Sequence, residues 1–92
     1  MPRYPFIIIR NPLCFGGGVS GRVVSRHKSL SAAVAARLRA NRDCRRANGQ
    51  NTWLDLEVCK ADRDWDVGSM GSGDEISAES MADAYDSIGV WR

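Results

Sequence analysis

The sequence predicts a small α+β domain: an antiparallel sheet of about three strands in β-β-α-β order, covered on one face by an arginine-rich helix and followed by a short C-terminal helix. Three observations lead to this fold class. A segment rich in β-branched residues, an alanine-rich segment with helical periodicity and a segment of alternating apolar and polar residues follow one another along the chain. With 92 residues, the chain has room for one domain.

The first two strands are predicted in the N-terminal third. Residues 4–10, YPFIIIR, are rich in aromatic and β-branched residues, which favour strands. Asn11-Pro12 is expected to end this strand, because proline cannot donate to a sheet ladder. Residues 19–25 predict the second strand, and the glycines at 16–18 predict a flexible turn. The two strands should therefore form a hairpin with a long tip, roughly residues 11–18.

A helix is predicted to begin at Leu30, where the chain becomes rich in alanine. Ser29 or Ser31 can cap its N-terminus by accepting a hydrogen bond from a free amide of the first turn. Asn48-Gly49 supplies the left-handed residue that commonly ends a helix. At 100° per residue Leu30, Val34 and Leu38 share one face, which should cover the sheet.

The third strand is predicted over residues 52–60, TWLDLEVCK, in which side chains alternate between two faces. Leu54, Leu56 and Val58 are expected to face the helix. The other face, expected to be in contact with water, carries Trp53, Asp55, Glu57 and Cys59.

Beyond Lys60 the chain becomes acidic and rich in glycine and serine, so residues 61–75 predict a mobile connector. A short helix from about Ser77 to Ile88 should follow. Its apolar face is formed by Met81, Ala84, Tyr85 and Ile88. The whole chain, 1–92, is expected to be one domain with its core within residues 3–60.

Charge is distributed very unevenly. Residues 1–46 hold ten of the thirteen lysines and arginines but one of the eleven acidic residues. A basic half of this kind indicates a partner rich in phosphate, although the two halves of a soluble protein can also simply neutralise each other. The candidate binding residues of the basic half are Arg22, Arg26, His27, Lys28, Arg37, Arg39, Arg42, Arg45 and Arg46.

Arginine dominates this basic set, and its planar guanidinium binds phosphates bidentately and stacks on bases. This favours nucleic-acid recognition, while an ordinary solvated helix face is the alternative. The acidic half can bind a basic protein surface or serve as a solubilising tail. Its candidate contacts are Asp62, Asp64 and Asp66, with Trp53 and Trp65 as interface anchors, because tryptophan is enriched at interface hot spots.

Catalysis and metal binding have little support in the sequence. His27 is the single histidine, and the three cysteines, Cys14, Cys44 and Cys59, lack the close pairing of zinc ligands. We expect no metal, no cofactor and no small-molecule substrate. The longest apolar run, Pro5–Ile9, is too short to cross a membrane, so no membrane partner is expected either. A small enzyme built on His27 and a cysteine remains an alternative.

The chain as a whole resembles a phage-encoded anti-CRISPR protein, a small inhibitor of the type I-F (Csy, or Cascade-type) crRNA-guided surveillance complex. The resemblance rests on the opening MPRYPFIIIRNPLCFGGGVSGRVVSRHKSL, on the arginine-rich helix and on the acidic GSMGSGDEISAES segment. It covers all 92 residues but no motif, so it assigns a role to no single residue.

The resemblance implies a protein that binds Cas subunits and guide RNA in the cytoplasm of the infected bacterial host. Without catalysis, such a protein prevents target DNA from being recognised or hybridised, whereas some members of this class instead block recruitment of the helicase-nuclease. The alternative is a free-standing regulator that binds RNA or DNA through the basic helix.

Overall fold

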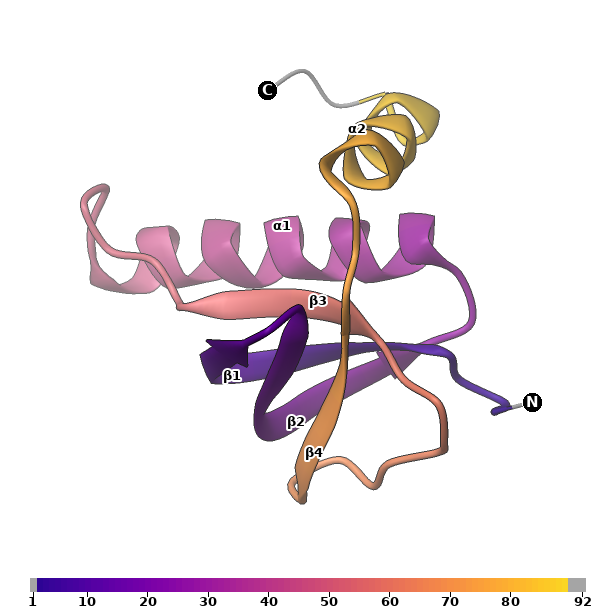
Figure 1. Cartoon of the computed structure of the whole chain (residues 1–92). Coiled ribbons are helices and arrows are strands. Elements are labelled where there is room, and N and C mark those ends of the chain that lie inside the picture. Colours follow the sequence, from indigo (N-terminus) through magenta and orange to yellow (C-terminus); the bar gives the residue numbers. More distant parts are fainter. Residues whose placement is uncertain (1, 90–92) are drawn as a thin grey trace.

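The computed structural model describes residues 2–89, which form four strands and two helices in the order β-β-α-β-β-α. The elements are β1 (Phe6–Phe15), β2 (Gly18–His27), α1 (Leu30–Asn48), β3 (Leu56–Lys60), β4 (Met70–Glu75) and α2 (Ala78–Ser87). All strand pairs are antiparallel, and the sheet closes in the order β1-β2-β4-β3. Helix α1 covers one face of the sheet and α2 lies against α1 (Figure 1). The predicted α+β class is confirmed, with one strand more than expected.

The first hairpin has a shorter turn than predicted. β1 does not end at Asn11-Pro12 but continues to Phe15. Its register with β2 shifts between Arg10 and Leu13, and Asn11 has the left-handed φ of 51°, so this pair forms an irregularity inside the strand. The turn consists of Gly16 and Gly17, whose φ angles of 54° and 87° are those of the tight turns that suit a twisted hairpin.

The prediction for α1 is confirmed at both ends. Ser29, not Ser31, is the N-cap, and its Oγ accepts a hydrogen bond of 3.1 Å from the amide of Ala32. Gly49 ends the helix with a φ of 112° and donates its amide to the carbonyl of Arg45. Leu30 and Val34 pack into the core beneath the helix, as their spacing predicts.

The third strand is shorter than predicted, and neither of its two faces is exposed to water along its whole length. It begins at Leu56, because the preceding segment is attached to α1: the amide of Leu54 donates to Asn41 Oδ1 at 2.6 Å. Cys59, expected to face water, is fully buried. The reason is that the sheet closes on itself, so that residues on both faces of β3 reach a core.

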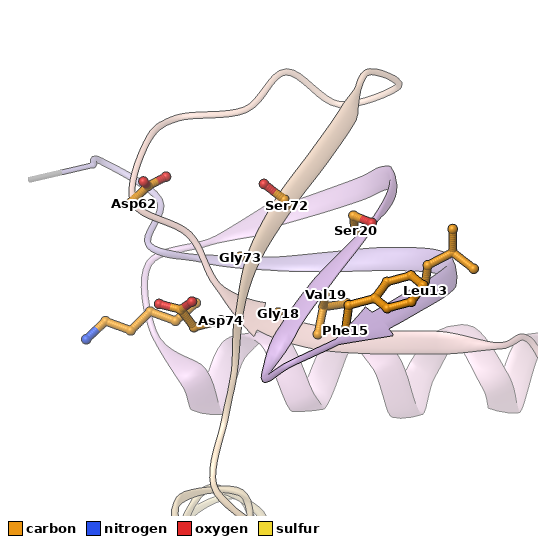
Figure 2. Close-up of a pocket in the computed structure, with 10 residues that line it drawn as sticks. Leu13, Phe15, Gly18, Val19, Ser20, Asp62, Ser72, Gly73 and Asp74 are labelled. Atoms are coloured by element: carbon orange, nitrogen blue, oxygen red, sulfur yellow. The ribbon is translucent and has the colours of Figure 1, made fainter.

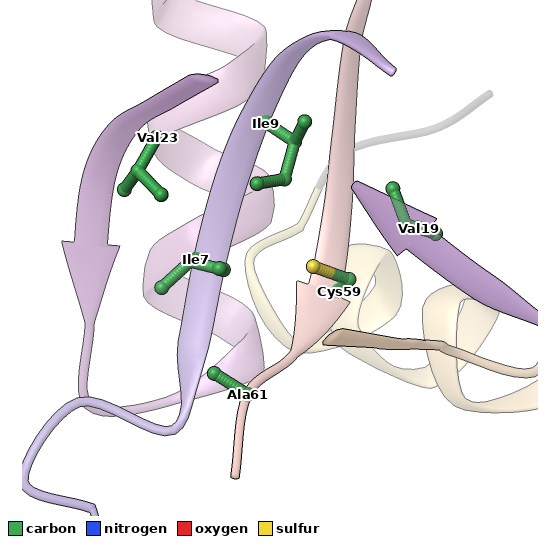
Figure 3. Packing of buried hydrophobic residues seen from close by; sticks show 6 residues of the cluster. All are labelled: Ile7, Ile9, Val19, Val23, Cys59 and Ala61. Atoms are coloured by element: carbon green, nitrogen blue, oxygen red, sulfur yellow. The ribbon is translucent and has the colours of Figure 1, made fainter. Parts of the chain in front are cut away.

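There are accordingly two hydrophobic clusters. The barrel cluster fills the interior of the closed sheet and is shown in Figure 3; it consists of Ile7, Ile9, Val19, Val23, Cys59 and Ala61. The helix cluster lies between the sheet and the helices. Its buried members are Ile8, Ala33, Val34, Leu56, Val58 and Ala84.

Residues 61–75 are not a mobile connector along their whole length, because residues 70–75 form β4. β4 pairs with Gly18–Arg22 of β2 and, at Asp74 and Glu75, with the end of β3. Its glycines face the barrel interior. A Cβ atom at Gly71 would lie 2.6 Å from the Val23 side chain, and one at Gly73 would lie 2.8 Å from Cys59 Sγ. Gly71 and Gly73 therefore allow the close packing of a narrow barrel, which is a different role from that of linker glycines.

The C-terminal helix is confirmed close to its predicted bounds. Ser77 caps it by accepting from the amide of Ser80. Ala84 is buried, and Met81, Tyr85 and Ile88 pack on the helix cluster. Trp91 lies outside the described residues. Neither described helix combines the length and the apolar composition needed to span a bilayer.

Candidate nucleic-acid interface

The second half of α1 is the most open part of the helix surface. α2 lies over the first half, where Ser31 hydrogen-bonds to Ser87 and Arg37 donates to the Tyr85 hydroxyl (Figure 1). Beyond this contact, two adjoining hollows follow α1 toward its C-terminus. They share Leu38 and Arg45 in their walls.

The first hollow has a volume of about 380 Å³ and lies between α1, Trp53 and Tyr85. Arg37 and Arg45 line it from the helix. The second hollow has a volume of about 390 Å³. It is lined by Arg39, Arg42 and Arg45 and by Ile88, the residue that follows α2. We call these two hollows the arginine groove. Its arginines are Arg37, Arg39, Arg42 and Arg45, and its aromatic residues are Trp53 and Tyr85.

The cations of the arginine groove are poorly neutralised by the protein itself. Within residues 2–89, Arg42 is the one member with an ion pair, a 3.8 Å contact to its neighbour Asp43. Both side chains are about 60% exposed, so this pair contributes little. No carboxylate in the described residues lies within 4 Å of the guanidinium of Arg39 or Arg45. The groove is therefore a basic surface that can accept an anion.

Trp53 provides an aromatic surface beside these cations. Its side chain is 71% exposed although it is one of the largest apolar residues of the chain. Exposed indoles next to arginines are typical of proteins that bind single-stranded nucleic acid, because bases stack on the ring while cations hold the backbone. The prediction of Trp53 as an interface anchor is thus compatible with its position.

The predicted basic residues before α1 do not join the groove. Arg22 donates to the carbonyl of Gly68 at 2.6 Å, and Arg26 donates to the carbonyl of Trp65 at 3.3 Å. Arg26 also lies over the Tyr4 ring, 4.7 Å from its centroid, with Lys28 nearby at 6.0 Å. These side chains hold the N-terminal segment and the segment between β3 and β4, so the basic set is divided by the fold.

A register shift explains why Arg26 leaves the helix side. Simple alternation along β2 would put Arg22 and Arg26 on the same face. The shift between Ile8 and Ile9 pairs Arg26 with Ile7, which belongs to the barrel cluster. Cross-strand partners share a face, so Arg26 lies at the mouth of the barrel.

One of the three predicted acidic contacts, Asp64, has a structural role. Asp64 accepts hydrogen bonds from the backbone amides of Tyr4 at 2.9 Å and Arg3 at 3.1 Å, and these bonds lower the pKa of its carboxyl. Asp62 contacts Arg63 at 3.3 Å, both exposed. Asp66 is exposed, and its carbonyl accepts from Ser69. The three aspartates are thus spread over one segment and form no common site.

Trp65, predicted as a second interface anchor, packs instead on the barrel cluster. Its Nε1 donates to the carbonyl of Ser72 at 2.9 Å, and Arg63 lies 5.2 Å from its ring centroid. The indole therefore attaches the segment before β4 to the sheet. Its half-buried position leaves part of the ring for other contacts.

His27 is placed beside a hydroxyl group. Its Nε2 lies 2.8 Å from Ser25 Oγ, a contact that a serine nucleophile and its base would share. The pKa of His27 is lowered, mainly because the ring is partly buried and to a lesser extent because Arg39 is positively charged. Within residues 2–89 no carboxylate lies within 4 Å of the ring to orient it. The pair lacks the third group that activates such a nucleophile.

The fold and the groove define a small α+β protein with a basic surface flanked by an exposed tryptophan. Comparisons of the chain with protein-family models, with curated proteins and with solved structures give no match. Sequence reasoning missed Tyr85 and Asn41 as neighbours of the arginines. The signal for Asn41 was its helical spacing from Arg37 and Arg45, which places all three on one side of α1.

Proposed function

We propose that this protein binds the phosphate backbone of RNA in its arginine groove, and that the RNA is the guide of a type I-F surveillance complex. The protein would then be an anti-CRISPR inhibitor that prevents target DNA from being recognised, without catalysis. The observation that carries the proposal is the convergence of four arginines and an exposed tryptophan on two adjoining hollows.

The geometry suits a backbone of several nucleotides. Arg37 and Arg45 are eight residues apart, which is about 12 Å along a helix. Guanidinium groups along this distance can contact successive phosphates, and each contact releases counterions from the nucleic acid. Trp53, at the edge of the first hollow, is placed to stack on an unpaired base. Single-stranded RNA is therefore a better fit than a duplex, whose bases are already stacked.

The choice of a type I-F complex rests on the resemblance of the sequence to anti-CRISPR proteins. In crRNA-guided complexes base pairing with the guide reads the target sequence. A protein that covers part of an exposed guide therefore stops recognition without chemistry. The basic groove supports this mechanism, because an exposed guide presents both phosphates and unpaired bases.

The test is a competition for target DNA. A purified type I-F complex is incubated with the protein, and binding of labelled target DNA is followed by electrophoretic mobility. Wild type should inhibit DNA binding, and the variant Arg39→Glu/Arg42→Glu/Arg45→Glu should not. The control variant Arg3→Glu/Arg10→Glu/Lys28→Glu carries the same change of charge outside the groove and should still inhibit. Equal inhibition by both variants would exclude the groove.

A free-standing RNA- or DNA-binding regulator is the second candidate. It is favoured by one observation, that all the residues lining the two hollows come from this one chain. Gel shifts with naked RNA and duplex DNA separate the two functions. Tight, salt-sensitive binding to naked nucleic acid supports the regulator, whereas binding that requires the Cas subunits supports the inhibitor.

A further inference from the structure

A second open surface lies on the sheet, away from α1. Two rows of paired residues cross the strands there. Phe15 pairs with Gly18, and Gly18 with Asp74; in the next row Leu13 pairs with Ser20, and Ser20 with Ser72. Paired residues share a face, so these side chains form one surface (Figure 2).

This surface is hollow because its centre has almost no side-chain volume. A Cβ atom at Gly18 would meet backbone oxygens alone, at 3.3 and 3.9 Å, so no side chain fills the space above it. The resulting hollow has a volume of about 350 Å³. We call it the sheet groove, and the residues that line it include Leu13, Phe15, Ser20, Lys60, Asp62 and Asp74.

One wall of the sheet groove is apolar and exposed. Phe15 is 79% and Leu13 63% exposed, and neither belongs to either hydrophobic cluster. Large apolar side chains gathered on an exposed surface commonly mark an interaction site. Both lie on the part of β1 that follows the irregularity at Asn11-Pro12, beyond the part that pairs with β3.

The opposite wall is charged, with Asp62 and Asp74 as its anions and Lys60 as its cation. Within residues 2–89 neither Asp74 nor Lys60 has an ion pair, and Asp62 contacts Arg63 outside the groove. Among the residues that line the groove there are thus two carboxylates and one ammonium group, and the exposed ion pair with Arg63 offsets little of the charge of Asp62. A phosphate backbone would be repelled here, whereas a cation beside an apolar surface would be attracted.

We propose that the sheet groove docks a basic segment of another protein, in which arginine or lysine alternates with apolar residues. The aliphatic stem of a long cationic side chain packs on Phe15 and Leu13, while its head reaches Asp62 and Asp74. Neighbouring apolar residues of the segment fill the space above Gly18. This surface is separate from the arginine groove, so the inference goes beyond the proposed function and does not depend on it.

The experiment uses the full chain, labelled for nuclear magnetic resonance. The probe is a synthetic peptide of Arg-Leu-Gly repeats, and its counterpart contains Glu in place of Arg. The arginine peptide should shift the amides of Leu13, Ser20 and Asp74, and the glutamate peptide should not. Shifts confined to α1, shifts of equal size with both peptides, or no shifts at all would each overturn the proposal.

Variants make the test specific. Asp62→Asn/Asp74→Asn should lower the affinity for the arginine peptide by about fivefold or more. Ser20→Leu fills the hollow and should lower this affinity to a similar extent. Val67→Ser changes an apolar residue that is 57% exposed outside the groove, and it should leave the affinity unchanged. Unchanged affinity in the first two variants would contradict the proposal.

Two further arms exclude other occupants. A single-stranded RNA oligonucleotide should shift amides of α1 and leave the sheet groove unaffected; RNA shifts in the groove would overturn the basic-segment assignment. If RNA shifts nothing but the peptide binds the sheet groove, this proposal stands, the free-standing RNA-binding regulator is contradicted, and the inhibitor is decided by the competition for target DNA described above. Dimer formation by wild type that Ser20→Leu abolishes would show that the occupant is a second copy.

Discussion

Gly73 lies so close to the end of β3 that a Cβ atom on it would be 2.6 Å from the Lys60 carbonyl oxygen. No real Cβ atom comes this near, and the obstacle is backbone, which cannot rotate away. The approach occurs where β3 and β4 pair and close the barrel, next to the buried Cys59. The absence of a side chain at position 73 is therefore a condition of closure.

Gly73→Ala should lower the free energy of unfolding by about 1–3 kcal/mol, because the strands must separate to admit the methyl group. The measurement is equilibrium unfolding in urea. Ser72→Ala is the matched control on the exposed face of β4 and should change stability by less than about 0.5 kcal/mol. Similar values for the two variants would show that the barrel tolerates a wider spacing.

The two described tryptophans should differ in their effect on folding. Trp65→Ala removes an indole that packs on the barrel cluster and bonds to Ser72, so we expect a loss of about 2 kcal/mol or more. Trp53→Ala should cost less than about 0.5 kcal/mol, because that side chain is 71% exposed. Thermal or urea unfolding of both variants measures the difference. A large loss of stability for Trp53→Ala would argue that it is a structural residue.

RNA binding through the arginine groove predicts a defined salt dependence. Arg45 lines both hollows of the groove, whereas Arg46, its neighbour on α1, lines neither. Arg45→Gln should reduce the slope of log K against log salt by about 0.7 for single-stranded RNA, the value for one lost phosphate contact. Arg46→Gln should leave the slope unchanged. The measurement is fluorescence anisotropy at several salt concentrations, and equal slopes for the two variants would contradict a specific groove.

His27 should titrate below its ordinary pKa of 6.5, mainly because it is partly buried and also because Arg39 is positively charged. Arg39→Gln should raise the pKa only part of the way back, since burial remains. Nuclear magnetic resonance can follow the ring directly, because the chain has one histidine. A His27 pKa that Arg39→Gln does not move would mean that the two charges do not interact.

The same shift has a consequence for stability. The unfolded chain binds a proton to His27 more readily than the folded chain, so stability should fall as the pH drops below about 6.5 toward the folded pKa. His27→Gln should remove this part of the pH dependence. Unfolding in urea at several pH values measures it, and an identical pH profile in wild type and His27→Gln would contradict it.

The cysteines should differ in reactivity. The Cys59 side chain is fully buried, and mainly this burial raises the pKa of its thiol to about 12. Cys14, by contrast, is exposed. Iodoacetamide should therefore modify Cys14 in the native protein and Cys59 only after unfolding. Mass spectrometry of the digested protein identifies the modified residue. Rapid native modification of Cys59 would indicate that the barrel opens readily.

The helices could be predicted from the sequence because their signals are local. Ser29 and Gly49 satisfy backbone groups within a few residues of themselves, and the spacing of Leu30 and Val34 directs one face to the core whatever lies opposite. The strand at Ile7–Ile9 could also be predicted, because three consecutive β-branched residues favour extended backbone. In each case the interactions that form the element lie within its own segment.

Closure of the barrel and the division of the basic residues were decided only by tertiary structure. Gly71 and Gly73 look like linker glycines until Val23 and Cys59, distant in sequence, are packed against them. Arg26 belongs to a basic stretch of the sequence, yet a register shift between β1 and β2 places its guanidinium at the carbonyl of Trp65, away from the arginine groove. Contacts between segments far apart in the chain set these outcomes, and no periodicity within a single segment encodes them.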